Sequence, residues 1–129
     1  MHPNEEIVRR LFEAFASNDL PTIDALLADD VVWTAPGRGV NAGRREGKRA
    51  LFEGMGRLAE LTGGTLRGEL HDVLASDEHV VVLQTTLGER DGRGPLEDRE
   101  AIVVHVRDGR VVEVWEHPGD LFAMDAFFS

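Results

Sequence analysis

The sequence predicts an α+β domain in which helices come first and a curved, mainly antiparallel sheet follows. Two periodicities indicate this class. Apolar residues recur at helical spacing up to about residue 61, and from residue 65 onward they alternate with a period of two. The pair Asp108-Gly109 is typical of a tight hairpin and makes the last two strands antiparallel neighbours. A sheet that curls over helices on one face leaves a conical cavity for a small ligand.

Two helices are expected at the start of the chain. The first carries five apolar residues at helical spacing, namely Ile7, Val8, Leu11, Phe12 and Phe15. We expect Asn4 to cap it. The second is short, because Asp19 is placed as its cap, Pro21 lies in its first turn and Asp29 closes its apolar stripe.

The remaining elements follow in order. Residues 31–35 predict a strand that Pro36 ends, residues 38–47 a loop, and residues 51–61 a third helix. Gly54 and Gly56 weaken that helix by about 1 kcal/mol each relative to alanine, which indicates close packing there. Four strands are expected at about 65–75, 79–89, 96–107 and 110–117. Asp120 is placed to cap a short final helix.

Composition bounds the function. The chain has 129 residues, no cysteine, and 24 acidic against 14 basic residues, a formal charge of −10. We expect one domain over residues 1–129, without a disulfide, zinc ribbon or thiol nucleophile. The negative charge disfavours nucleic acid as a partner. Because no signal sequence or membrane-spanning run is present, we expect a cytoplasmic protein with no membrane partner. The histidines lack metal-ligand spacing, so no metal site is expected.

The element order and two phrases, LADDVVW at 27–33 and RDGRVVEVW at 107–115, resemble the SnoaL-like branch of the nuclear transport factor 2-like superfamily. The resemblance covers essentially the whole chain. It implies a cone-shaped curved antiparallel (mixed) sheet wrapped around the N-terminal helices. It is specific for fold and weak for activity, because the superfamily includes polyketide cyclases, ketosteroid isomerases, limonene-epoxide hydrolases and non-catalytic members.

Two of these chemistries lack their residues here. Ketosteroid isomerases carry a base aspartate where this chain has Ala35, and their oxyanion-hole tyrosine is missing because the chain contains no tyrosine. Limonene-epoxide hydrolases hold water with a tyrosine and an asparagine, which here are Trp33 and Ala35. Their Asp-Arg-Asp set falls on His117, Gln84 and Thr86, or on Arg90 for the arginine if the gap is placed differently.

SnoaL-like cyclases use an acid/base aspartate beyond the tryptophan of the last strand, and Asp120 and His117 stand there. Alternation on strand 96–107 independently turns the even residues toward the cavity, which makes Glu100 an inward carboxylate. If His117 faces the cavity as well, Trp115 and Glu113 share its face. We therefore predict an acid/base set of His117, Asp120 and Glu100.

Each member also has a structural interpretation. His117 could be a hydrogen-bonded residue at a strand end, Asp120 a helix cap, and Glu100 the partner of Arg99 or Arg90 at the cavity rim. The expected substrate-binding residues are Trp33, Ala35, Phe52, Met55, Gln84, Thr86, Asp98, Ile102, Trp115, Phe122 and Met124. Their aromatic and apolar members suit a flat hydrophobic substrate, although tryptophans are also common in cores.

Residues 38–49 hold five Lys or Arg against one Glu, in front of the expected third helix. This basic loop could bind an anion at the cavity mouth, or it could be a solvated loop that balances an acidic surface. Residues 112–129 carry only acidic charges, so pairing between subunits is a further option.

These observations lead to one hypothesis and one alternative. The hypothesis is a cofactor-independent enzyme that acts on a hydrophobic substrate by acid/base chemistry, such as cyclisation, isomerisation or hydration. The alternative is a non-catalytic small-molecule-binding or dimerisation scaffold with the same fold. In either case we expect a homodimer that forms through the outer face of the sheet.

Overall fold

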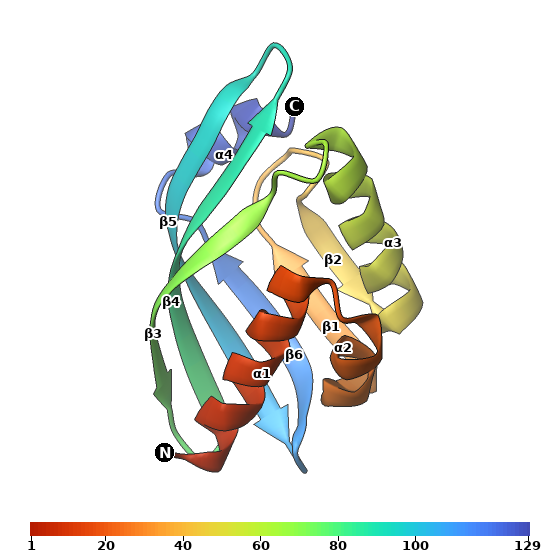
Figure 1. The fold of residues 1–129 in the computed structure, drawn as a ribbon, viewed down its shortest axis with the longest axis vertical. Coiled ribbons are helices and arrows are strands. Elements are labelled where there is room, and N and C mark those ends of the chain that lie inside the picture. Colours follow the sequence, from red (N-terminus) through yellow and green to blue (C-terminus); the bar gives the residue numbers. More distant parts are fainter.

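The sheet of this protein has six strands in the order β2-β1-β6-β5-β4-β3. The computed structural model describes residues 1–129 (Figure 1). Its elements are α1 (Pro3–Ser17), α2 (Leu20–Leu26), β1 (Leu27–Ala35), β2 (Gly43–Glu46), α3 (Gly47–Leu61), β3 (Arg67–Ala75), β4 (His79–Arg90), β5 (Gly94–Arg107), β6 (Arg110–His117) and α4 (Leu121–Phe127). The α+β class and the four late strands are confirmed.

The sheet is mixed because one pair of neighbours is parallel. Strand β1 runs parallel to β6, while every other pair of adjacent strands is antiparallel. Residues 43–46, expected to lie in a loop, form the edge strand β2. Their sequence Gly-Arg-Arg-Glu carries no strand signal, and the strand exists because it pairs with β1, with Arg45 opposite Trp33.

Two of the three helix caps expected from the sequence are confirmed. Asp19 accepts a hydrogen bond from the Thr22 backbone at 3.3 Å, and Asp120 accepts one from Ala123 at 3.0 Å. The expected Asn4 cap is wrong, because His2 Nδ1 caps α1 by accepting from the Asn4 backbone at 3.0 Å. The freed Asn4 amide donates to two backbone carbonyls in the turn between β3 and β4.

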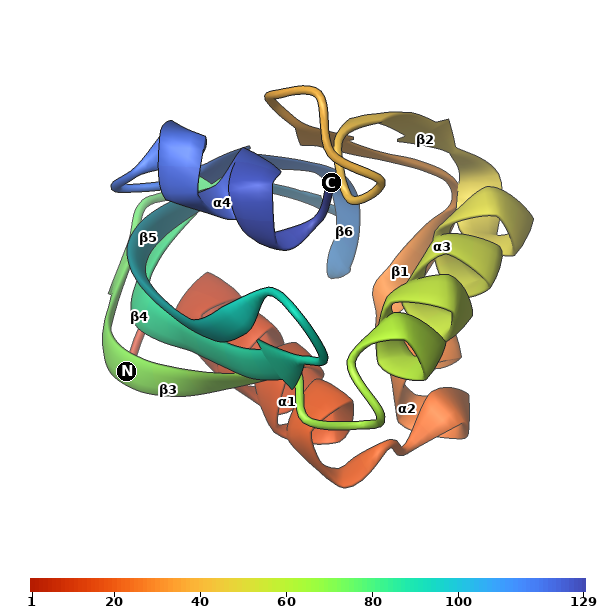
Figure 2. The same cartoon turned by 90° about the horizontal axis from the view of Figure 1, so that it is seen from above.

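Two apolar cores hold the helices to the sheet. The main core joins α1, α2 and α3 to the inner face of the sheet through buried residues such as Val8, Leu11 and Val104. A smaller core gathers Leu96 with residues of the C-terminal helix and tail. Seen from above, the sheet curves around α1, and α3 and α4 lie on different sides of the molecule (Figure 2). No helix combines the length and apolar character needed to cross a membrane.

Candidate functional site

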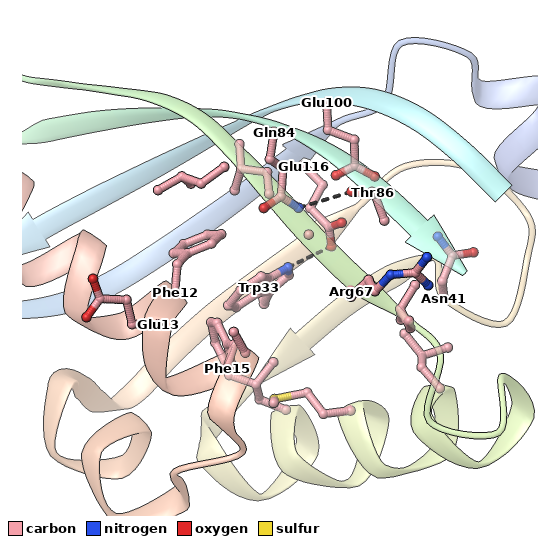
Figure 3. A pocket seen from close by; sticks show the side chains of 18 of the residues that line it. Phe12, Glu13, Phe15, Trp33, Asn41, Arg67, Gln84, Thr86, Glu100 and Glu116 are labelled. Carbon is pink, nitrogen blue, oxygen red and sulfur yellow. Dashed lines mark hydrogen bonds between the residues drawn. The ribbon is translucent and has the colours of Figure 1, made fainter. Parts of the chain in front are cut away.

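A cavity of about 600 Å³ lies between the two cores. Its lining includes Leu51 and Ile102 of the main core and Leu58 and Leu66, which pack against the smaller core. The volume lies within the range of small-molecule sites. The sheet supplies most of the polar lining, whereas the two helices α1 and α3 supply most of the apolar lining (Figure 3).

Aromatic rings form part of the apolar wall. Phe12 and Phe15 of α1 contact edge to face at 5.7 Å between ring centroids, and Phe15 contacts Trp33 in the same way at 5.7 Å. Met55 of α3 also lines the cavity. Such a wall offers flat, polarisable surface to a ring-containing ligand.

Two carboxyl groups face the cavity from adjacent strands. Glu100 lies on β5 and Glu116 on β6, where Glu116 is opposite Ile102, two residues from Glu100. Glu100 is only 4% exposed. Trp33 donates from its indole nitrogen to Glu116 Oε2 at 2.7 Å, a contact drawn in Figure 3. The inward orientation of the even residues of β5, including Glu100, was expected from alternation and is confirmed.

Burial raises the pKa of both carboxyl groups. Burial raises the pKa of Glu100 to about 8, and the charges of Glu116 and Asp98 act in the same direction. Burial also raises the pKa of Glu116, but the Trp33 N–H, the Arg45 charge and a hydrogen bond from Glu100 oppose that rise. A pKa of about 8 keeps Glu100 largely protonated at neutral pH, and ionisation of either carboxyl disfavours ionisation of the other.

The other polar lining comes from β4 and from the segment around β2. Gln84 donates to the Thr86 hydroxyl at 3.0 Å, and the Thr86 hydroxyl favours the ionised form of Glu100. The Arg45 guanidinium donates to the carbonyls of Asn41 at 2.9 Å and Val40 at 3.2 Å. Trp33, Met55, Gln84, Thr86 and Ile102 thus line the cavity as expected.

The expected inward orientation of His117 is wrong. His117 is exposed and lies opposite Ala101, and Trp115 lies opposite Val103, away from the cavity. The cause is an irregularity in β6. Residues 104 and 106 of β5 pair with Val114 and Val111, so β6 carries an extra residue at that point and the alternation after it is inverted. Glu116 therefore takes the inward position that sequence reasoning gave to His117.

Other expected site residues have structural surroundings. Asp120 caps α4 and does not line the cavity. Asp98 is buried, and its carboxylate accepts hydrogen bonds from the backbones of Gly119 at 3.2 Å and Asp120 at 2.9 Å. This carboxylate fixes the turn between β6 and α4, so its role is in positioning that turn.

Four expected apolar contacts also lie outside the cavity lining. Phe122 is 91% exposed, because it lies on the face of α4 that carries no core residue. Met124, on the other face of α4, belongs to the smaller core. Phe52 packs against the main core, and Ala35 is buried at the end of β1.

The cations of the 38–49 segment have mostly acidic partners within the chain. Arg44 pairs with Glu46 at 2.8 Å, Arg49 pairs with Glu53 at 3.2 Å, and Lys48 lies 3.2 Å from two aspartates. Arg45 differs, because it turns into the cavity and has no carboxylate within ion-pair distance. Sequence reasoning missed Arg45, Asn41 and Glu116 as lining residues. The charge excess at 38–49 was the one signal that pointed toward the first of them.

Comparison with known proteins agrees with this architecture. The SnoaL-like domain family matches residues 8–114. An uncharacterized protein of Mycobacterium tuberculosis is 34% identical over 125 residues, which cover 96% of this chain and 95% of that protein. Bal32a, from a soil-derived mobile gene cassette, superposes with a TM-score of 0.94 at 38% identity, covering 98% of this chain and 97% of Bal32a.

A more distant structure shares the fold alone. IdmH from Streptomyces antibioticus, a proposed polyketide cyclase, superposes with a TM-score of 0.76 at 22% identity, covering 98% of both chains. The nuclear transport factor 2-like fold implied by the sequence is thereby confirmed. With the family match spanning most of its length, this chain belongs to the SnoaL-like family.

Proposed function

We propose that this protein is a cofactor-independent enzyme that moves protons on a hydrophobic small molecule held in the cavity. The observation that carries the proposal is the Glu100–Glu116 pair, in which two carboxyl groups with raised pKa values face one cavity. A pair with one acid and one base at neutral pH can donate and accept protons in the same turnover.

The pair supports a balanced proton transfer. The Glu116 carboxylate accepts a proton from a carbon next to a carbonyl, while the Glu100 acid donates its proton to the carbonyl oxygen. The product of this step is an enol, and both carboxyls have exchanged protonation states. In isomerisation, protonated Glu116 returns its proton to a different carbon of a conjugated enol. In ring closure, the enol carbon attacks a second carbonyl, whose oxygen takes that proton from Glu116. In both cases the enol O–H gives its proton back to Glu100, which regenerates the starting pair.

The apolar wall indicates the kind of substrate. Phe12, Phe15 and Met55 offer contact to rings but no charge, and the carboxyl pair lies beside Trp33. A ring-containing ketone or a related carbonyl compound therefore suits the cavity. The non-catalytic alternative uses the same wall to hold a ligand without turnover, and the following experiment separates the two.

The test is exchange of carbon-bound protons with deuterium oxide, followed by NMR over a panel of hydrophobic ketones and lactones. The wild type is expected to catalyse exchange for at least one compound. Glu100→Gln and Glu116→Gln are expected to lower the rate by roughly 100- to 10,000-fold while ligand affinity stays within a few-fold. Glu97→Gln is the matched control, because Glu97 lies on the same strand but is exposed.

Two results would contradict the proposal. One is exchange that persists in both cavity variants, which would exclude the pair as the acid and base. The other is ligand binding with no exchange for any bound compound, which would favour the non-catalytic scaffold.

A further inference from the structure

Asn41 is a buried polar residue with no hydrogen-bond partner for its side chain. It is 7% exposed, it lines the cavity, and its Oδ1 atom accepts no hydrogen bond. Leaving a buried polar group unpaired destabilises the folded state, so most such groups in folded proteins have partners. Figure 3 shows the Asn41 side chain at the end of the cavity away from Phe12 and Glu13.

The backbone that carries Asn41 is held in place. The Val40 amide donates to the Phe128 carbonyl at 2.9 Å, and the Arg45 guanidinium donates to the carbonyls of Val40 and Asn41. The Asp125 carboxylate accepts from the backbone amides of Arg38 at 2.9 Å and Gly39 at 3.2 Å. The side-chain amide is therefore presented on a fixed loop, as a ligand-binding group needs to be.

Arg45 is the second unusual group at this end. Two of its five N–H donors reach backbone carbonyls, and no carboxylate lies within ion-pair distance. Its charge reaches Glu116, because it lowers the pKa of that carboxyl. The other arginine that lines the cavity, Arg67, is neutralised by Glu89 at 3.2 Å.

We propose that Arg45 and Asn41 form a subsite for an anionic oxygen of the ligand, so that the ligand is a ring compound with a carboxylate or an enolate-type oxygen at one end. The guanidinium supplies charge and free donors, and the Nδ2 atom of Asn41 supplies N–H donors, whereas its Oδ1 atom is an acceptor and does not bind the anionic oxygen. The inference rests on the proposed function only in taking this cavity as the ligand site, and it requires no turnover.

At this end of the cavity a cationic group of the ligand is disfavoured. It would meet the Arg45 guanidinium, which no carboxylate contacts within ion-pair distance, and a purely apolar group would leave the Asn41 Nδ2 donors without an acceptor. With its anionic oxygen bound at this subsite, the ligand would place its ring portion against the wall of Phe12, Phe15 and Met55, beside the Glu100–Glu116 pair.

The test compares two probes of nearly equal shape, 2-naphthoate and 2-naphthamide, by isothermal titration calorimetry at neutral pH. The carboxylate is expected to bind the wild type at least tenfold more tightly than the amide, since hydrogen bonds to a charged acceptor are stronger than those to a neutral one. Arg45→Met and Asn41→Leu are expected to remove most of that preference. Arg44→Gln is the matched control, because the neighbouring Arg44 is exposed and paired with Glu46.

The thermal melting temperature of each variant shows whether it is folded. If Arg45→Met is unfolded, Asn41→Leu alone carries the test. Equal affinity for the two probes, or a preference for naphthoate that both cavity variants retain, would overturn the inference. Glu100→Gln separates it from the proposed function. If naphthoate preference survives in that variant while proton exchange is absent even in the wild type, the subsite stands and the enzyme proposal fails.

Discussion

Glu100 shows how far burial changes a single residue, and it makes stability depend on pH. In the unfolded chain a glutamate loses its proton near pH 4.3, whereas burial and nearby charges raise the folded pKa of Glu100 to about 8. Between these values the folded state binds the proton and the unfolded state does not. Unfolding free energy should therefore fall as pH rises, with a limiting slope of about 1.4 kcal/mol per pH unit.

Glu100→Gln replaces the acid by a neutral amide of the same shape, so it should flatten this profile and stabilise the protein at pH 8. Urea denaturation at pH 5.5 and pH 8 measures the effect. The exposed Glu97→Gln variant should retain the wild-type pH dependence. If Glu100→Gln lost stability between the two pH values as steeply as the wild type, the raised pKa of Glu100 would be excluded.

Alternation along its own strand predicted Glu100, whereas His117 was placed inward from its position beyond the last-strand tryptophan, and Glu116 was missed. Strand β5 pairs with β4 without a break from His79–His105 to Arg90–Gly94, so period-two alternation assigns its faces correctly. Strand β6 gains one residue between Val111 and Val114, and alternation counted through that point assigns the opposite face. Val111 and Val114, which bound the irregularity, are both valines, so no local residue type marks it.

At the scale of elements, α3 offers a matched pair of glycines. A methyl group added at Gly56 would meet nothing within 4 Å, so the sequence-based expectation of close packing is wrong there. At Gly54 it would collide with the Arg45 side chain, whose Cδ lies 2.8 Å from the position of the added carbon. An alanine at position 54 would therefore have to displace the Arg45 side chain that lies across this glycine.

Gly56→Ala should stabilise the protein by about 0.5–1 kcal/mol, the usual gain of alanine over glycine in a helix. Gly54→Ala should lose that gain and displace Arg45 from the Val40 and Asn41 carbonyls, which would weaken naphthoate binding about tenfold. Denaturation and calorimetry on both variants measure these effects. Equal naphthoate affinity in the two variants would show that Arg45 does not depend on Gly54.

Helices and strands with strong local signals were predictable, and elements that depend on distant partners were not. The caps Asp19 and Asp120 are local and were correct. Strand β2 has no strand-forming residues and forms only because β1 presents a free edge to it. Asn4 does not cap its helix, because two carbonyls in the β3–β4 turn bind its amide.

At the scale of the whole molecule, the cavity exists because the two cores do not meet. Met124 and Phe127 of α4 pack with Leu96 in the smaller core, and the curved sheet keeps that core apart from the main one. The sequence predicts a cone with a pocket from element order and family resemblance. The sequence does not reveal that Phe122 and Met124 of α4 lie outside the cavity lining. The docking of α4 depends on the contacts of Asp98 with the turn before that helix.

The outer face of the sheet carries an apolar row of four residues. Leu74, Val81, Val103 and Trp115 are paired across four adjacent strands, and Leu74 is 52% exposed. The row lies on the face opposite the cavity, since the inward residues of β5 and β6 are the alternate ones. Monomeric proteins seldom expose a contiguous apolar patch, and a symmetric partner could cover it with the same row.

The expected homodimer stays a prediction, and this row gives it a specific test. Sedimentation equilibrium at micromolar concentration should give twice the chain mass of 14.2 kDa. Val103→Glu should yield folded monomers, because a charge in the centre of the row would be buried against its symmetry mate. Phe122→Glu should remain dimeric, because Phe122 is 91% exposed but lies on α4, away from the row. A wild-type monomer, or dissociation by Phe122→Glu alone, would exclude a dimer through this face.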